Sequence, residues 1–240
     1  MENLQEASLK SIALNHFEFI PVLEKYNLDF CCRGKKTLIQ ACNEKAISIE
    51  AILEEMNQIA APSKAQMPFG DMSTEQLTSY ILIHHHFYVK NSIPTILNHI
   101  EKVVLKHGDK YPYMPKVLDL FKAVAEDLMT HMEKEEQILF PRIKLIFGTD
   151  NQAAQDFPIL NYIDGPMMVM EQEHEKVGDL LFEIRTITNH YLAPETACTT
   201  HRVCLDELKA FEEDLHQHVH LENNILFPMA KNRMQHKCMI

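Results

Sequence analysis

The chain has 240 residues, an apolar content of 46% and a formal charge of −11, which suits a helical bundle with a small companion domain and argues against disorder. Its acidic residues are spread along the sequence, and this excludes nucleic acid and anionic membrane as main partners. No apolar run approaches the roughly 20 residues of a membrane span, and the acidic N-terminus lacks the pattern of a signal peptide, so we expect a cytoplasmic protein.

The N-terminal quarter predicts a small helical domain. Only six glycines and no strand-like alternation indicate an all-α protein. Residues 1–60 read as short helices around a turn, Asn27–Gly34, which carries the adjacent Cys31 and Cys32. Six cysteines, scattered apart from this pair, do not form a disulfide framework. Residues 61–73 have the composition of a linker.

Residues 74–240 predict an antiparallel four-helix bundle. Ser73 offers N-cap chemistry for its first helix. Prolines interrupt the helical pattern and mark the connections. The predicted helices cover residues 74–107, 115–147, 159–190 and 196–234. The prolines assigned to connections are Pro112, Pro115, Pro158, Pro166 and Pro194.

The second and fourth predicted helices carry the same motif, H-x-x-x-E-x-x-I-L-F-P, at His131–Pro141 and His218–Pro228. An internal repeat of this kind predicts a pseudo-twofold bundle of two helical hairpins. Within each motif the His and Glu are four residues apart and project from one helix face. That face continues an apolar stripe, whose next member is Ile138 in one helix and Ile225 in the other.

The first and third helices each add one inward histidine. His174 lies on the apolar stripe of the third helix. Among three consecutive histidines in the first helix, His86 shares a stripe with Leu82 and Val89. An ionised Glu on such a face is costly unless it is paired or bound to a metal. The predicted metal ligands are His86, His131, Glu135, His174, His218 and Glu222.

This ligand set predicts two first-row metal ions that share carboxylate bridges. Four imidazoles and two carboxylates suit iron best, while zinc accepts the same ligands and stays open. A single inward histidine is ordinarily a core residue, but six ligands related by a repeat favour a metal site. His216 and His220 are a rival pair, which we assign to a solvated face. The histidines assigned to the surface or to the outer shell of the site are His84, His85, His99, His107, His190, His201 and His236.

These motifs resemble the hemerythrin-like bundles, and nearly the whole chain is similar to the Repair of Iron Centres family, of the YtfE/ScdA type. The resemblance implies an ScdA-type N-terminal domain followed by a hemerythrin-like bundle. It also implies that the same six ligands hold two non-haem iron ions, bridged by the two Glu and an oxo or hydroxo group. The segments that carry it are Tyr26–Leu38, His131–Pro141, Met170–His174, Ala197–Thr200 and His218–Pro228.

The resemblance also points to residues around the site, although the catalytic residue stays unknown. Glu173 and Asp127 fall on acidic positions near the family's centre, where the family more usually has Glu at the second. Cys31 and Cys32 fall on the family's cysteine pair, which is followed here by Arg33 rather than Gly. Two interpretations of the pair stay open: reactive thiols favoured by neighbouring cations, or small apolar residues that pack the domain.

The function implied by the resemblance is repair of iron–sulfur clusters damaged by nitrosative or oxidative stress, with the damaged iron–sulfur proteins as partners. Oxygen-carrying hemerythrins have H-x-x-x-H in the third helix, whereas this chain has Gly178 four residues after His174. The missing ligand favours an open position for nitric oxide or oxygen, or iron release. Alternatives are a nitric oxide or oxygen sensing module and a nitric oxide reductase. Monomer and homodimer both stay open.

Overall fold

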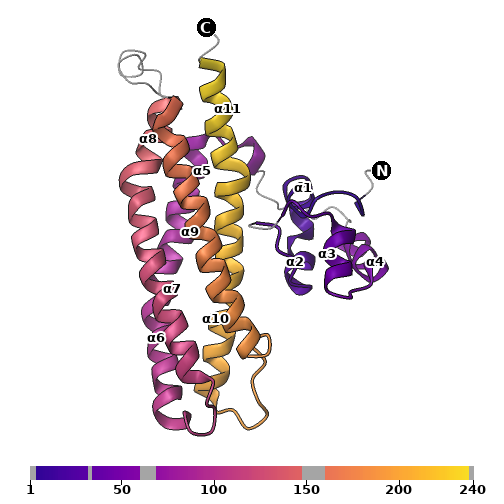
Figure 1. Cartoon of the computed structure of the whole chain (residues 1–240), viewed down its shortest axis with the longest axis vertical. Helices are drawn as coiled ribbons and strands as arrows, with labels where there is room; N and C mark the ends of the chain where they lie inside the picture. Colours follow the sequence, from indigo (N-terminus) through magenta and orange to yellow (C-terminus); the bar gives the residue numbers. More distant parts are fainter. Residues whose placement is uncertain (1–3, 32–33, 60–68, 148–159, 238–240) are drawn as a thin grey trace.

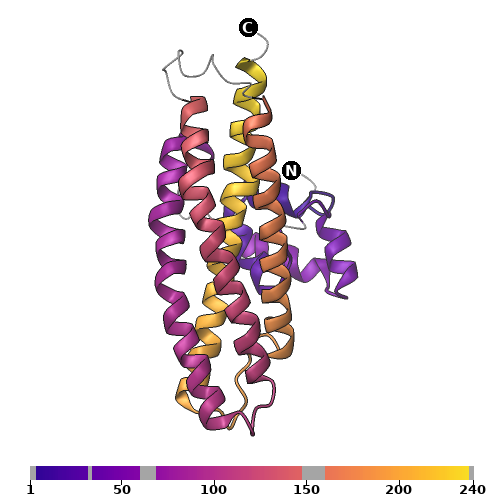
Figure 2. The ribbon, with the colours of Figure 1, turned by 60° about the vertical axis from the view of Figure 1, so that its left-hand side comes forward.

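The computed structural model describes residues 4–31, 34–59, 69–147 and 160–237. Every named element within these ranges is helical, so the predicted all-α class is confirmed. Figure 1 shows long helices packed side by side as a bundle, with a group of short N-terminal helices against one side of it. Consecutive long helices run in opposite directions, as the turned view in Figure 2 also shows.

Four long helices build the bundle close to the predicted boundaries. Its first helix is composed of α5 (Thr74–Tyr80), η3 (Ile81–His86) and α6 (Phe87–His107). Its second is composed of α7 (Met114–Lys134), η4 (Glu135–Leu139) and α8 (Phe140–Phe147). Its third is α9 (Leu160–Ile187), and its fourth is composed of α10 (Thr199–Leu221), η5 (Glu222–Leu226) and α11 (Phe227–Lys237).

Local sequence signals explain where the bundle helices begin. Ser73 caps α5 in a capping box, because its Oγ accepts from the backbone N–H of Gln76 at 3.2 Å and its own N–H donates to the Gln76 side chain at 2.9 Å. Pro166 was expected in a connection, but it lies inside α9. The neighbouring Ile163 and Met167 are fully buried, and this packing holds the helix continuous through the proline.

Three π-helical turns, η3, η4 and η5, make the residues that face the core differ from those predicted. Each π turn contains more residues than an α turn, so the helix beyond it presents a rotated face to the core. Ile138 was expected in the core but is 41% exposed, whereas Leu139 is buried. The same change puts Ile81 in the core in place of Leu82, which is half-buried. In the fourth helix Leu226 is buried and Ile225 is half-buried.

The repeated proline accounts for the position of two of these turns. Pro141 and Pro228 are the second residues of α8 and α11, the helices that directly follow η4 and η5. Proline has no N–H to donate, and its ring collides with the carbonyl group four residues earlier. A wider turn before the proline relieves that collision. The motif I-L-F-P is therefore the sequence signal for a π turn in both helices.

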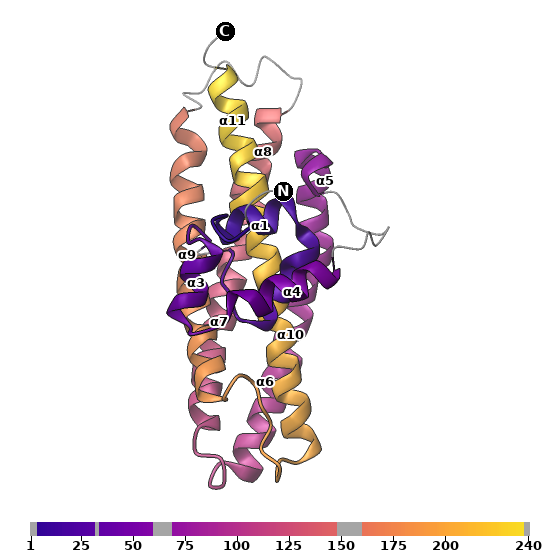
Figure 3. The same ribbon diagram turned by 90° about the vertical axis from the view of Figure 1, so that its right-hand side faces the viewer.

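The N-terminal unit lies against α9 and α10 at mid-height of the bundle (Figures 1 and 3). Side chains from both parts meet there: Glu24 with His216, and Asn27 with Arg185. Its helices are α1 (Leu9–Asn15), η1 (Phe17–Phe19), α2 (Ile20–Lys25), α3 (Leu38–Glu44) and α4 (Ile49–Ile59). Residues 60–68 of the expected linker lie outside the described ranges, while Phe69–Asp71 form a short turn, η2, that buries Phe69.

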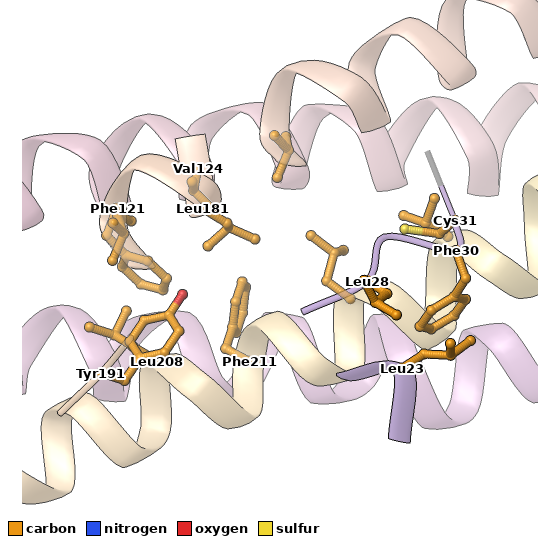
Figure 4. Packing of buried hydrophobic residues seen from close by; sticks show 14 of the residues in the cluster. Leu23, Leu28, Phe30, Cys31, Phe121, Val124, Leu181, Tyr191, Leu208 and Phe211 are labelled. Atoms are coloured by element: carbon orange, nitrogen blue, oxygen red, sulfur yellow. The ribbon is translucent and has the colours of Figure 1, made fainter. Parts of the chain in front are cut away.

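The buried apolar side chains form two separate clusters. The lower cluster joins the N-terminal unit to α6, α7 and α10. Figure 4 shows Leu28 and Phe30 toward one side of this cluster and Phe121 and Phe211 toward the other. The upper cluster lies around Phe140 of α8. Between the two clusters lies a layer of polar side chains, which contains the predicted metal ligands.

Candidate metal centre

The six predicted ligands lie together in this layer, and each of their side chains is buried. Their donor atoms form two groups, and within each group all atoms lie within 4.8 Å of one another. Glu135 and Glu222 belong to both groups. One group adds His86 and His218, and the other adds His131 and His174. Two shared carboxylates between two histidine pairs are an arrangement that could hold metal.

The Nε2 atom of each histidine points toward a shared carboxylate. In Glu135, one oxygen lies 3.4 Å from His86 Nε2 and the other 3.3 Å from His131 Nε2. In Glu222, one oxygen lies 3.0 Å from His218 Nε2 and the other 3.1 Å from His174 Nε2. Each carboxylate therefore offers one oxygen to each side of the layer.

The electrostatics of the layer fit a cation. Burial would lower the pKa of His131, but the charge of the adjacent Glu135 and a hydrogen bond to Glu173 raise it to about 10. Burial likewise opposes ionisation of Glu222, yet His218 and His174 hold its pKa well below the usual value. Both effects mean that the layer favours added positive charge, here protons on imidazole. Both oxygens of Glu135 lack a hydrogen-bond partner within the described residues, and a bound cation would satisfy them.

Helix geometry brings the layer together. The His and Glu of each motif lie at the junction of an α-helix with a π turn. His131 is in the last turn of α7 and Glu135 begins η4, while His218 is in the last turn of α10 and Glu222 begins η5. His86 is the last residue of the π turn in the first helix. π turns are frequent at functional sites because they redirect side chains within a continuous helix.

Sequence reasoning did not find the residues that hold the outer nitrogen atoms of the histidines. Glu136 bonds His86 Nδ1 at 2.7 Å, and Asn223 bonds His174 Nδ1 at 3.0 Å. Both residues directly follow a ligand Glu in the repeated motif, and that position is the signal that could have revealed them. Such outer partners fix the orientation of a ligand imidazole.

The two acidic candidates differ in their contacts. Glu173 bonds His131 Nδ1 at 3.0 Å and also pairs with Lys134. The hydrogen bond from His131 is the main cause that lowers the pKa of Glu173 to about 2. Asp127 instead pairs with Lys176 at 2.7 Å. The structure thus brings Glu173, rather than Asp127, into contact with a predicted ligand.

Cys31 is buried in the N-terminal unit, and its thiol donates to Asp29 Oδ1 at 3.3 Å. It lines a cavity of about 280 Å³ between that unit and the bundle. Gly178, four residues after His174, lines the same cavity. Cys32 and Arg33 lie outside the described residues.

The rival pair His216 and His220 was wrongly assigned to a solvated face. His220 is buried against the ring of Phe30, and His216 bonds Glu24 at 2.9 Å. The N-terminal unit covers this face of α10, and a pattern read from one helix does not reveal a covering domain. Neither histidine belongs to either group of potential metal ligands.

Two further histidines, His85 and His201, are buried rather than exposed at the surface. His85 is buried, bonds Asp214 at 3.0 Å and stacks on His218, which agrees with the outer shell of the site. His201 was expected at the surface or in that shell, but it is fully buried near the lower end of the bundle. There it bonds the hydroxyl group of Tyr113 at 3.1 Å, so aromatic packing rather than the site explains its burial.

Comparison with known proteins places the chain in a family. The hemerythrin HHE cation binding domain matches residues 77–230, and ScdA_N, a domain of unknown function, matches residues 5–60. The iron–sulfur cluster repair protein YtfE of Yersinia pseudotuberculosis is 35% identical over 224 residues, which cover 93% of this chain and 96% of that protein. The chain belongs to the YtfE family of iron–sulfur cluster repair proteins.

Other members of the YtfE family match to a similar extent. The proteins of the same name from Dickeya chrysanthemi and Cronobacter sakazakii are 33% and 35% identical, and each match covers 94% of this chain. These matches cover 97% and 96% of the two relatives. The cation binding domain and the buried His and Glu cluster together indicate that this chain binds metal. None of the described helices combines the length and apolar character that a membrane span requires.

Proposed function

We propose that this chain is a di-iron protein that takes part in the repair of iron–sulfur clusters damaged by nitrosative or oxidative stress in the cytoplasm. Its partners are then damaged iron–sulfur proteins. The proposal follows the printed name of its relatives and the cation binding domain that it shares with them. The observation that carries it is the pair of donor groups that share Glu135 and Glu222.

We further propose that six residues hold two iron ions and that both Glu bridge them. The mixed imidazole and carboxylate donor set suits first-row ions, and the orphaned oxygens of Glu135 suit a bridging role. Iron held there would supply exchangeable metal and a binding position for a small ligand such as nitric oxide or oxygen. The proposed ligands are His86, His131, Glu135, His174, His218 and Glu222.

The surrounding residues support these roles. Glu173 orients His131 and carries a negative charge close to the layer. Gly178 offers no ligand, and it borders the cavity between the domains. We propose the domain division 1–60, 61–73 and 74–240 for the helical N-terminal domain, the linker and the di-iron bundle.

Metal analysis joined to a repair assay tests the proposal. The purified chain is expected to contain about two iron ions, and the iron-loaded protein should restore a cluster enzyme that has been inactivated with nitric oxide. Stoichiometric zinc with no recoverable iron form would contradict the iron assignment. Iron without repair, together with turnover of nitric oxide to nitrous oxide, would favour a reductase instead. Reversible nitric oxide or oxygen binding without either activity would favour a sensing module.

A further inference from the structure

The four inward histidines do not have equal support at their outer nitrogen atoms. His131 Nδ1 bonds Glu173 and His174 Nδ1 bonds Asn223, each at 3.0 Å. His86 Nδ1 bonds Glu136 at 2.7 Å. His218 Nδ1 is buried and has no hydrogen-bond partner in the described part of the chain. In the His131–His174 half of the centre, both histidines thus have a hydrogen-bond partner at Nδ1. In the His86–His218 half, only His86 has one among the described residues.

The internal repeat explains the origin of this difference. Glu173 directly precedes His174, and the residue in the equivalent position before His86 is His85. Where Glu173 reaches across to His131, His85 stacks on His218 with ring centroids 5.5 Å apart and an interplanar angle of 7°. A stacked ring offers no acceptor in the plane of the neighbouring imidazole.

The side chain of His85 is held in the stacked position. Its own Nδ1 bonds Asp214 Oδ1 at 3.0 Å. Its Nε2 is buried without a partner in the described residues, so it too does not reach His218. A glutamate in the third helix and a histidine in the first thus give the two halves different surroundings.

Support at the outer nitrogen matters for metal affinity. A partner there fixes the tautomer and the ring orientation of the ligand and raises its basicity, and loss of such a partner typically weakens metal binding about 10–100-fold. In the His131–His174 half, the Glu173 carboxylate bonds one histidine and the Asn223 amide bonds the other. Lys134 forms an ion pair with that carboxylate. The other half lacks one of these supports.

We propose that the two halves of the centre bind metal unequally, so that the His86–His218 half holds the ion that exchanges first. The inference rests on the proposed two-ion function and deepens it. The ion between His131 and His174 stays bound about 10–100-fold more tightly. Iron given to a damaged cluster then comes from the His86–His218 half, while the other ion keeps the layer assembled.

A pair of equivalent variants tests this inequality. His86→Ala leaves the His131–His174 half intact, and His174→Ala leaves the His86–His218 half intact. Each metal-free protein is titrated with Fe²⁺ without oxygen against a chelator of known affinity. The remaining ion is expected to bind about 10–100-fold more tightly in His86→Ala than in His174→Ala. Equal affinities, or the reverse order, would overturn the inference.

A second variant distinguishes the effect of the hydrogen-bond partner at His131 Nδ1 from a general loss of folding. In the His86→Ala background, Glu173→Ala should abolish most of the affinity difference, because it removes the outer partner of His131. Glu171→Ala is the matched control, since Glu171 pairs with Lys231 at the surface of the same helix. Equal effects of the two substitutions would contradict the inference. If the wild-type chain binds fewer than two iron ions, the proposed function itself fails; two ions of equal affinity overturn only the inequality.

Discussion

At the scale of single residues, the two shared carboxylates decide whether the centre exists. Glu135 and Glu222 are fully buried, and each belongs to both donor groups. A histidine ligand serves one half only, so its loss leaves the other half complete. In the proposed centre, the two shared carboxylates therefore matter more for metal content than any single histidine.

Substitution of Glu222 tests this ranking. We expect Glu222→Ala to lower bound iron below one ion per chain, whereas His218→Ala should retain up to one. Glu213→Ala, which changes a half-buried residue of the same helix that pairs with Lys209, should keep about two. Iron and protein are quantified on the same purified samples. Full iron content in Glu222→Ala would show that the carboxylate is not a ligand.

The sequence could predict the inward side chains of the layer but not their surroundings. Helical periodicity selected His86 among three neighbours, and the structure places its Nε2 beside Glu135. Periodicity carries no information about partners on other helices, so Glu136 and Asn223 were missed. It also misplaced His220, because burial by a separate domain leaves no trace in the pattern of α10.

At the scale of helices, the π turns determine which residues reach the core. Helix boundaries were predictable from prolines and from the cap at Ser73, since these signals are local. The rotation introduced by η4 was not, because the stripe was extended with ordinary α-helical spacing. The largest difference between the predicted and the observed helices is therefore which residues beyond the π turn face the core.

Alanine substitutions of two neighbouring residues in η4, the buried Leu139 and the exposed Ile138, test that rotation. Leu139→Ala should lower the free energy of unfolding by about 2–5 kcal/mol, because it leaves a cavity in the upper cluster. Ile138→Ala should change it by less than about 1 kcal/mol, since that side chain is 41% exposed. Urea unfolding of both metal-loaded variants measures the two values. A larger loss of stability in Ile138→Ala than in Leu139→Ala would show that the helix continues with ordinary α-helical spacing.

At the scale of the whole molecule, a half-buried ion pair links the N-terminal unit to the bundle. His216 of α10 bonds Glu24 at 2.9 Å. Burial opposes the charge on His216, but Glu24 raises its pKa to about 9. The two-part architecture was predictable from composition, whereas this contact was not, because nothing in either segment alone specifies the other as its partner.

The ion pair predicts a pH-dependent stability. The folded pKa of about 9 exceeds the unfolded value of 6.5, so the native state holds the proton more tightly. The contribution is complete below pH 6.5 and is lost as the pH rises through 9. Glu24→Gln should therefore lower the free energy of unfolding by about 2 kcal/mol at pH 6.5 and by much less at pH 10.

Urea unfolding of wild type and Glu24→Gln at the two pH values measures this difference. Glu54→Gln, which removes a charge from an exposed position of the same unit, serves as the control. It should show no comparable change with pH. A Glu24→Gln effect that is equal at both pH values would show that His216 carries no pH-dependent charge at the contact.

The polar layer also affects how the bundle unfolds, because it divides the buried apolar side chains into two clusters. Hydrophobic burial among the described residues is thus not continuous along the bundle, whose two halves are connected by the helices and by the ligand layer. Metal that joins four helices at that layer would make the two halves unfold cooperatively. Without metal, the upper half should open first, since the N-terminal unit adds its core to the lower cluster alone. A chain without both ions is then expected to be cleaved by proteases in α8 and α11 sooner than the metal-loaded chain.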